Sequence, residues 1–129
     1  MSKPNPVTWF EIYVKDMKRA RTFYEKTLGT PLKKMEVPST AGLDEMWSFS
    51  SEGEGHYGAS GALVKMPGGP AGGGGTLVYF ECEDCGVAAK RVAPNGGKLM
   101  KDKFPIGPHG FIAIATDTEG NGFGLHSMK

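Results

Sequence analysis

The sequence has few cysteines, little net charge and no long apolar run. Two cysteines among 129 residues are too few for a framework of disulfide bonds. A net charge of +1 does not indicate a surface for nucleic acid. No segment approaches the ~20 consecutive apolar residues of a membrane span, and no apolar stretch near the start has the pattern of a signal peptide. We therefore expect a cytoplasmic protein with no nucleic-acid or membrane partner.

Glycine, by contrast, is abundant, and much of it lies in one segment near the middle of the chain. The chain has 20 glycines, about twice the usual share, and residues 66–75 are nearly all Gly and Pro. Such a segment buries few side chains and loses much entropy on ordering, so we expect a flexible connector. A phosphate-binding loop would need a helix with a Lys after it, whereas residues 76–82 have the pattern of a strand.

A short sequence pattern occurs on both sides of this connector. The segment Phe10–Asp16 returns in altered form as Val78–Asp84, a shift of 68 residues (84 − 16 = 68). Each copy is an apolar strand pattern that ends at an Asp and leads into a helical pattern. With the same shift, Gly29 aligns with Gly97. Two copies predict two similar half-sheets, with a cleft between them as the natural place for function.

Each half has the pattern β-α-β-β-β. In the first half, a strand at 8–14 precedes a helix that Asp16 should cap and Gly29 should end. Phe23 belongs to the apolar stripe of this helix, so we expect Phe23→Ala to cost ~3–5 kcal/mol as a core truncation. The full stripe is Met17, Ala20, Phe23, Tyr24 and Leu28.

The remaining elements follow from alternating apolar residues and turn signals. Three further strands of the first half are expected at 32–37, 45–49 and 58–66. The second half should begin with a strand at 76–82 and a helix from Asp84 to about Ala93, ended by Pro94. Its last three strands are expected at 97–100, 110–116 and 122–126.

The quoted segments resemble the vicinal oxygen chelate superfamily, which contains glyoxalases, bleomycin resistance proteins and extradiol dioxygenases. The residues that carry the resemblance are Phe10–Asp16, the repeat at 79–84 and the turn at 117–121, which is similar to the family's Asp-Pro-Asp-Gly-Asn. The resemblance implies one α+β domain of two βαβββ modules in a pseudo-two-fold arrangement, with strands curled around a cleft. The modules would span about 7–66 and 76–127, joined by the linker 67–75. It also implies a small-molecule ligand and a homodimer.

Many similar proteins hold a divalent metal ion with His, Gln or Glu from strands of both modules. By resemblance, three of the expected ligand positions fall on Trp9, Leu77 and Gly124, and a fourth lies in the strand 58–66, which has no His or acidic residue. None of these side chains can hold a hard divalent ion. We therefore expect no cofactor and no metal site of the usual kind.

Strand alternation indicates which side chains face the predicted cleft. If Trp9 faces the cleft, Glu11 shares its face, as do Tyr79 and His126 in the second half. Glu11 is the candidate catalytic residue, because a carboxylate in a partly apolar cleft suits a general base; alternatively it is paired with a polar neighbour such as His126. Trp9 and Trp47 could stack on an aromatic ligand, although burial alone would explain either. The candidate ligand-binding residues are Trp9, Glu11, Trp47, Tyr79 and His126.

The two cysteines form a single C-x-x-C motif, Cys82 and Cys85. A zinc site would need two more ligands nearby, and none is evident. A redox pair would suit the start of a helix, but Cys82 should point into the core, so we expect two unrelated thiols.

Three functions remain open from the sequence. The first is metal-independent binding of a small molecule, which needs only a shaped apolar cleft. The second is a glyoxalase-like lyase or isomerase, in which Glu11 and His126 would supply an unusual metal site. The third is an interaction subunit without catalysis.

Overall fold

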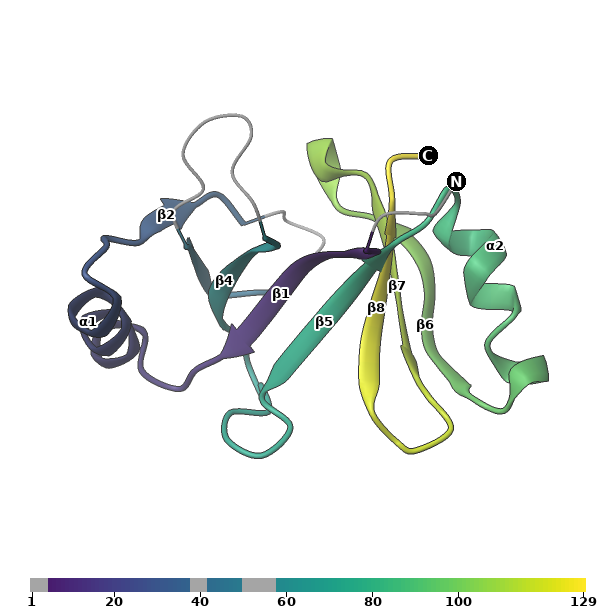
Figure 1. The fold of residues 1–129 in the computed structure, drawn as a ribbon, viewed down its shortest axis with the longest axis horizontal. Helices are drawn as coiled ribbons and strands as arrows, with labels where there is room; N and C mark the ends of the chain where they lie inside the picture. Colours follow the sequence, from purple (N-terminus) through teal and green to yellow (C-terminus); the bar gives the residue numbers. More distant parts are fainter. Residues whose placement is uncertain (1–4, 38–41, 50–57) are drawn as a thin grey trace. The chain divides into compact units, whose positions relative to one another are not determined.

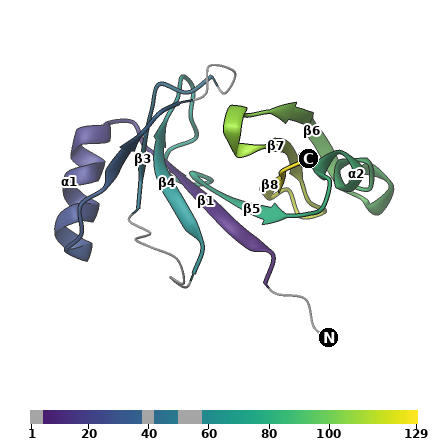
Figure 2. The same cartoon turned by 90° about the horizontal axis from the view of Figure 1, so that it is seen from above.

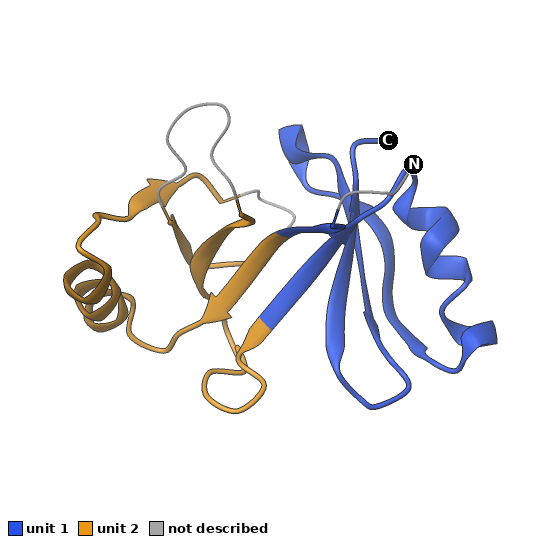
Figure 3. Cartoon of the chain, in the orientation of Figure 1, with its two compact units in different colours: residues 1–8, 77–129 blue, residues 9–76 orange. Residues whose placement is uncertain are grey.

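The computed structural model describes residues 5–37, 42–49 and 58–129 (Figure 1). The chain divides into two compact units, which Figure 3 colours separately. Unit 2 comprises residues 9–76, and unit 1 comprises residues 1–8 and 77–129. The order of elements is β-α-β-β-β twice, as the sequence predicts, with two short 3-10 helices added in the second half. In the parts of the chain that are described, no helix is long and apolar enough to cross a bilayer.

Unit 2 is built on four strands in the order β2-β3-β4-β1. Strand β4 pairs with β3 in antiparallel and with β1 in parallel, and β2 pairs with β3 in antiparallel. Helix α1 lies on one face of these strands (Figure 2). Met17, Leu32 and Leu63 are buried together there. The bounds are β1 Val7–Tyr13, α1 Met17–Leu28, β2 Lys33–Met35, β3 Glu45–Ser48 and β4 Ser60–Lys65.

Helix α1 begins and ends at the residues that its sequence predicts. The Asp16 carboxylate accepts a hydrogen bond from the backbone N–H of Arg19 at 3.0 Å, which satisfies one of the free donors of the first turn. Gly29 ends the helix with φ 71°, a left-handed conformation that side chains disfavour. Both signals depend only on neighbours in the chain, which is why the sequence locates the helix well.

The apolar stripe of α1 is narrower than predicted. Met17 is buried, but Phe23 is 60% exposed and Leu28 is 59% exposed. Phe23 lies six residues after Met17, which puts it about 120° away around the helix. That angle lies beyond the edge of the buried stripe. The expectation that Phe23 is a core residue is therefore wrong.

Unit 1 contains four strands in the order β5-β8-β7-β6. Strand β5 is parallel to β8, and β7 is antiparallel to both β8 and β6. Helix α2 packs on one face, where Cys85, Ala89, Ala113 and Leu125 are buried together. The bounds are β5 Thr76–Glu81, α2 Cys85–Lys90, β6 Lys98–Pro105, β7 Phe111–Thr116 and β8 Gly122–Ser127, with 3-10 helices η1 Ala93–Asn95 and η2 Gly107–His109.

Two elements of unit 1 differ in length from the prediction. Helix α2 ends at Lys90, three residues before Ala93, because its last turn tightens: the N–H groups of Arg91 and Val92 bond three residues back. Strand β6 continues to Pro105 instead of ending at Met100. Its pairing with β7 shifts register between Leu99 and Phe104, and such bulges interrupt the alternation by which a strand is recognised.

Candidate functional site

A buried carboxylate marks the face of unit 2 that lies opposite α1. Glu11, in the middle of β1, is 8% exposed. Its Oε2 accepts a hydrogen bond from the indole N–H of Trp9 at 3.1 Å, and its Oε1 accepts one from the hydroxyl of Tyr13 at 2.7 Å. The three residues are two positions apart along the strand, so their side chains emerge on the same face. Trp9, Glu11 and Tyr13 form what we call the β1 cluster.

Buried apolar side chains lie against the two aromatic members of the β1 cluster. Trp9 and Tyr13 pack against Met46, Ala62 and Val64, which are buried. Burying a carboxylate among such groups is costly unless hydrogen-bond donors replace the lost water. The Trp9 and Tyr13 donors do so, one on each oxygen, and they fix the orientation of the carboxylate. The result is an oriented acceptor between two aromatic side chains.

Trp47 lies on the other face of the same sheet. It packs with Met17, Leu32 and Leu63 beneath α1, and the guanidinium carbon of Arg21 is 3.4 Å from the centre of its ring. Its indole N–H donates to the carboxylate of Glu45. The structure therefore places Trp47 on the face opposite the β1 cluster. Alternation within one strand shows which of its residues share a face. It does not show which residues of β3 lie on the same face as those of β1, because that depends on how the strands pair.

Tyr79 and His126 share a face of unit 1, as alternation predicts, because β5 and β8 pair Tyr79 with Gly124 and Glu81 with His126. The Nδ1 atom of His126 is 2.6 Å from Oε1 of Glu81, and its Nε2 is 2.6 Å from the carbonyl oxygen of His109. The imidazole is thus held between a carboxylate and a backbone carbonyl of η2. Pairing of His126 with Glu11 was one reading of the sequence; the partners observed for His126 are Glu81 and His109.

Two residues of these faces were not selected from the sequence. Tyr13 holds Glu11, and Glu81 holds His126. Strand alternation puts both residues on the correct faces, so the signal was present. A carboxylate or imidazole that is removed from water requires a hydrogen-bond partner. The partner of Glu11 lies two positions along the same strand, whereas the partner of His126 lies opposite it on the paired strand β5.

The ring of Tyr79 covers Gly124, one of the positions where the family resemblance leads one to expect a metal ligand. A Cβ atom at residue 124 would stand closer to the ring carbons than real Cβ atoms approach their neighbours. At a second such position, Trp9 offers an N–H donor that is already directed to Glu11. In the described ranges, no three His, Cys, Asp or Glu side chains gather as a metal-binding group. The residues at these positions therefore do not fit a divalent ion.

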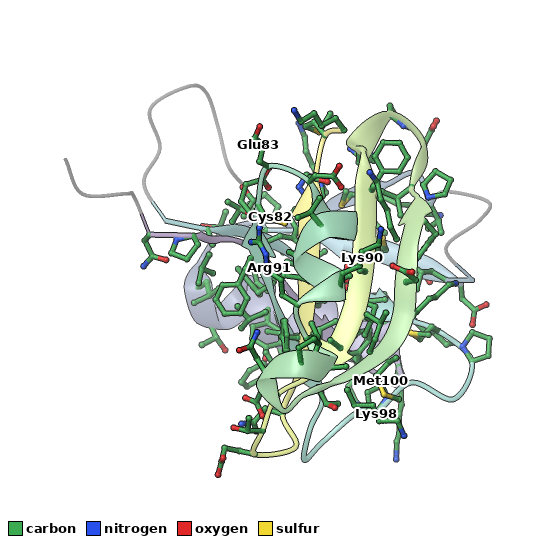
Figure 4. The ribbon with its side chains drawn as sticks, turned by 90° about the vertical axis from the view of Figure 1, so that its right-hand side faces the viewer. Cys82, Glu83, Lys90, Arg91, Lys98 and Met100 are labelled. Carbon is green, nitrogen blue, oxygen red and sulfur yellow. The ribbon has the colours of Figure 1, made fainter. Side chains whose placement is uncertain are left out.

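Both thiols of the C-x-x-C motif are free. Cys82 is half-buried at the end of β5, beside α2 (Figure 4), and its Sγ is 3.4 Å from the carbonyl oxygen of His126. Burial raises the pKa of the Cys82 thiol. Cys85 is fully buried in the core beneath α2. The raised pKa of Cys82 disfavours the thiolate that redox chemistry needs, and Cys85 is closed off from solvent.

Comparison with known proteins decides the family. A sequence model described as "Glyoxalase/Bleomycin resistance protein/Dioxygenase superfamily" matches residues 7–125. The chain belongs to this superfamily. Its α+β architecture of two βαβββ modules is the glyoxalase/bleomycin-resistance fold of that family.

Similar proteins and solved structures are consistent with membership of this superfamily. The chain is 28% identical over 119 residues to "Putative glyoxylase CFP32" of Mycobacterium bovis, covering 91% of this chain and 43% of that protein. It thus spans less than half the length of this mycobacterial relative. It is 30% identical over 118 residues to a "Glyoxylase-like domain-containing protein" of Didymella fabae, covering 89% and 88%. The methylmalonyl-CoA epimerase of Mycobacterium tuberculosis has the same fold, with a TM-score of 0.68, 16% identity and coverage of 100% and 93%.

Proposed function

We propose that this chain binds a small organic molecule on the face of the β1 cluster and needs no metal ion to do so. The observation that carries the proposal is the buried carboxylate of Glu11, oriented by Trp9 and Tyr13 within an apolar surface. Small-molecule sites are mostly apolar and contain few polar groups, each in a defined orientation. The β1 cluster has this composition.

The chemistry of the cluster indicates a class of ligand. A fixed carboxylate accepts hydrogen bonds, and it does so most strongly from a cationic donor. The rings of Trp9 and Tyr13 offer flat apolar surface beside it. We therefore propose a ligand with an apolar or aromatic body that carries an amine, hydroxyl or amide donor. The side chains at Trp9, Leu77 and Gly124 support binding without the divalent metal that many family members use.

A thermal-shift screen tests this proposal. Protein stripped with EDTA is heated with a library of aromatic amines, alcohols and amides, because a ligand specific for the native state raises Tm by mass action. We expect hits that Glu11→Gln weakens about tenfold or more, since charge-assisted hydrogen bonds are worth roughly 1.5–3 kcal/mol. Glu45→Gln is the matched control, because Glu45 also accepts from an indole N–H but on the α1 side. Hits that appear only after a divalent metal is added would refute metal-independent binding.

A second candidate is an enzyme that moves a proton, as a glyoxalase-like lyase or isomerase. Its support is that similar proteins carry the names glyoxylase and methylmalonyl-CoA epimerase. Glu11 would then act as the general base. Incubation with methylmalonyl-CoA in D2O, followed by proton NMR, tests this candidate. Loss of the C2 proton signal with the wild-type chain but not with Glu11→Gln would favour the enzyme over the binding protein.

We extend the proposal to a cytoplasmic homodimer, as the family resemblance and the composition lead us to expect. Sedimentation equilibrium of the purified protein tests the dimer directly. A single species with the mass of one chain, 13.8 kDa, at all concentrations would count against it.

A further inference from the structure

A hollow lies at the start of α1, within unit 2. Its volume is about 520 Å³, which is within the range of small-molecule sites. Its walls come from the end of β1, the first two turns of α1 and the glycine-rich loop. None of the three residues of the β1 cluster lines it. The lining residues that matter here are Val14, Lys15, Arg19, Phe23, Tyr24 and Gly72.

Phe23 gives this hollow an exposed aromatic wall. Its side chain is 60% exposed, although other side chains of the same helix pack against the sheet. The ring is held by packing. The Phe23 and Tyr24 rings form an edge-to-face contact with their centroids 5.1 Å apart, and the Tyr24 and Phe49 rings form another with their centroids 5.6 Å apart. This chain of edge-to-face contacts holds the Phe23 ring in position while one side faces the hollow. Such a ring is suited to stack on a flat ligand.

A second wall comes from Ala71 and Gly72 of the glycine-rich loop. Gly72 has no side chain, and its loop is closed by hydrogen bonds of its own, such as that from the N–H of Gly75 to the carbonyl oxygen of Gly72 at 2.8 Å. The N–H of Tyr13 also donates to the carbonyl oxygen of Gly75 at 2.8 Å, which ties the loop to the end of β1. The segment predicted to be a connector thus forms a wall that a flat molecule can approach closely.

The charges around the hollow favour one negative charge in the ligand. Lys15, Asp16 and Arg19 line it, for a formal sum of +1. The Asp16 carboxylate is directed to the helix, since Oδ1 accepts from the N–H of Arg19 and Oδ2 is 3.9 Å from Nη1 of the same residue. Within the described part of the chain, Lys15 makes no ion pair. A monoanion would therefore find an ammonium group to pair with.

We infer that this hollow binds a small aromatic carboxylate. The aromatic body stacks on Phe23 against the backbone at Gly72, and the carboxylate lies between Lys15 and Arg19. This site is independent of the function proposed for the β1 cluster, because the two share no residue.

Isothermal titration with 2-naphthoate, and with the neutral methyl 2-naphthoate as the comparison ligand, tests the inference; the ester carries neither a charge nor a hydrogen-bond donor for the β1 cluster. We expect 2-naphthoate to bind and the ester to bind at least fivefold more weakly. Phe23→Ala should weaken binding about tenfold, the loss of stacking and contact area. Lys15→Gln should weaken it about threefold, and the difference should shrink at high salt because surface charge pairs are screened.

Two matched controls and one overlap test complete the experiment. Leu28→Ala removes an equally exposed apolar side chain of α1, and Lys18→Gln removes an exposed lysine of the same helix; neither residue lines the hollow. Both controls, and Glu11→Gln, should leave the affinity for 2-naphthoate unchanged. Equal binding of the ester, no effect of Phe23→Ala and Lys15→Gln, or loss of binding in Glu11→Gln would each overturn the inference.

Discussion

The ring of Tyr79 fills the space that a side chain at Gly124 would occupy. The two residues are paired across β5 and β8, and both are buried. Aromatic rings commonly cover a glycine on a neighbouring strand, because the glycine leaves a gap that the ring can fill. This packing explains how residue 124, where the family resemblance leads one to expect a metal ligand, can be a glycine without leaving a gap beside the ring of Tyr79.

We predict that Gly124→Ala destabilises the protein by ~1–3 kcal/mol, because the added methyl group overpacks the contact with Tyr79. Gly122→Ala is the matched control in the same strand: its Cβ would meet Leu77 at 3.5 Å, an ordinary contact. Urea denaturation of each variant measures the difference in the free energy of unfolding. In a Tyr79→Leu background the cost of Gly124→Ala should fall, as a double-mutant cycle will show. An equal cost at positions 122 and 124 would contradict the packing argument.

Phe23→Ala should change stability by less than ~1 kcal/mol, since surface substitutions rarely do more. The side chain is 60% exposed, so its loss creates no core cavity. Met17→Ala on the same helix should cost ~2–5 kcal/mol, because Met17 is buried against Leu63. Thermal and urea unfolding of the two variants give the comparison. A larger loss for Phe23→Ala than for Met17→Ala would mean that the buried face of α1 is assigned wrongly.

The ion pair between Asp84 and Lys103 should make stability depend on pH in the acid range. The ammonium of Lys103, 3.0 Å from Oδ1, is the main reason that the pKa of the Asp84 carboxyl lies below its ordinary value, and the N–H of Gly86 adds to the effect. A lowered pKa in the folded state stabilises the protein above the ordinary Asp pKa of ~3.9, and this contribution is lost as pH falls through the lowered value.

Asp84→Asn should therefore lower Tm at neutral pH, and the difference from wild type should shrink as pH falls below about 4. Glu36→Gln, a change at an exposed carboxylate, is the control and should leave the pH profile unchanged. Scanning calorimetry across pH 2.5–7 measures both. A difference for Asp84→Asn that stays constant down to the lowest pH would contradict the assigned role of the ion pair.

The two thiols should react slowly and in a fixed order. Because burial raises the pKa of Cys82, its alkylation by iodoacetamide should be slow at pH 7 and accelerate as pH rises above the ordinary thiol range of ~8.5. Cys85 is fully buried and should react only when the protein unfolds. Mass spectrometry of the labelled peptide separates the sites, with Cys82→Ser as the control that removes native-state labelling. Rapid labelling of Cys85 in the native protein would refute its assignment to the core.

Much of the fold was predictable because it depends on short stretches of chain. The helix caps at Asp16, Gly29 and Asp84 act on backbone groups within a few residues. The family was also predictable, since the family model matches residues 7–125 and agrees with the resemblance that the sequence segments carry. Part of the candidate site was predictable for the same reason. Trp9 and Glu11 lie two positions apart on one strand, and Tyr79 and His126 share a face by alternation. Whether these residues bind a ligand stays a prediction.

The sequence by itself determined the order and approximate positions of the strands and helices, because periodicity and capping are local properties of the chain; it did not determine the ends of α2 and β6. Only the tertiary structure decided that Phe23 faces outward, that Trp47 lies beneath α1, and that Tyr79 closes over Gly124. Each of these depends on contacts between residues far apart in the chain. Their geometry is set by how strands pair and how a helix packs on them, which no single segment encodes.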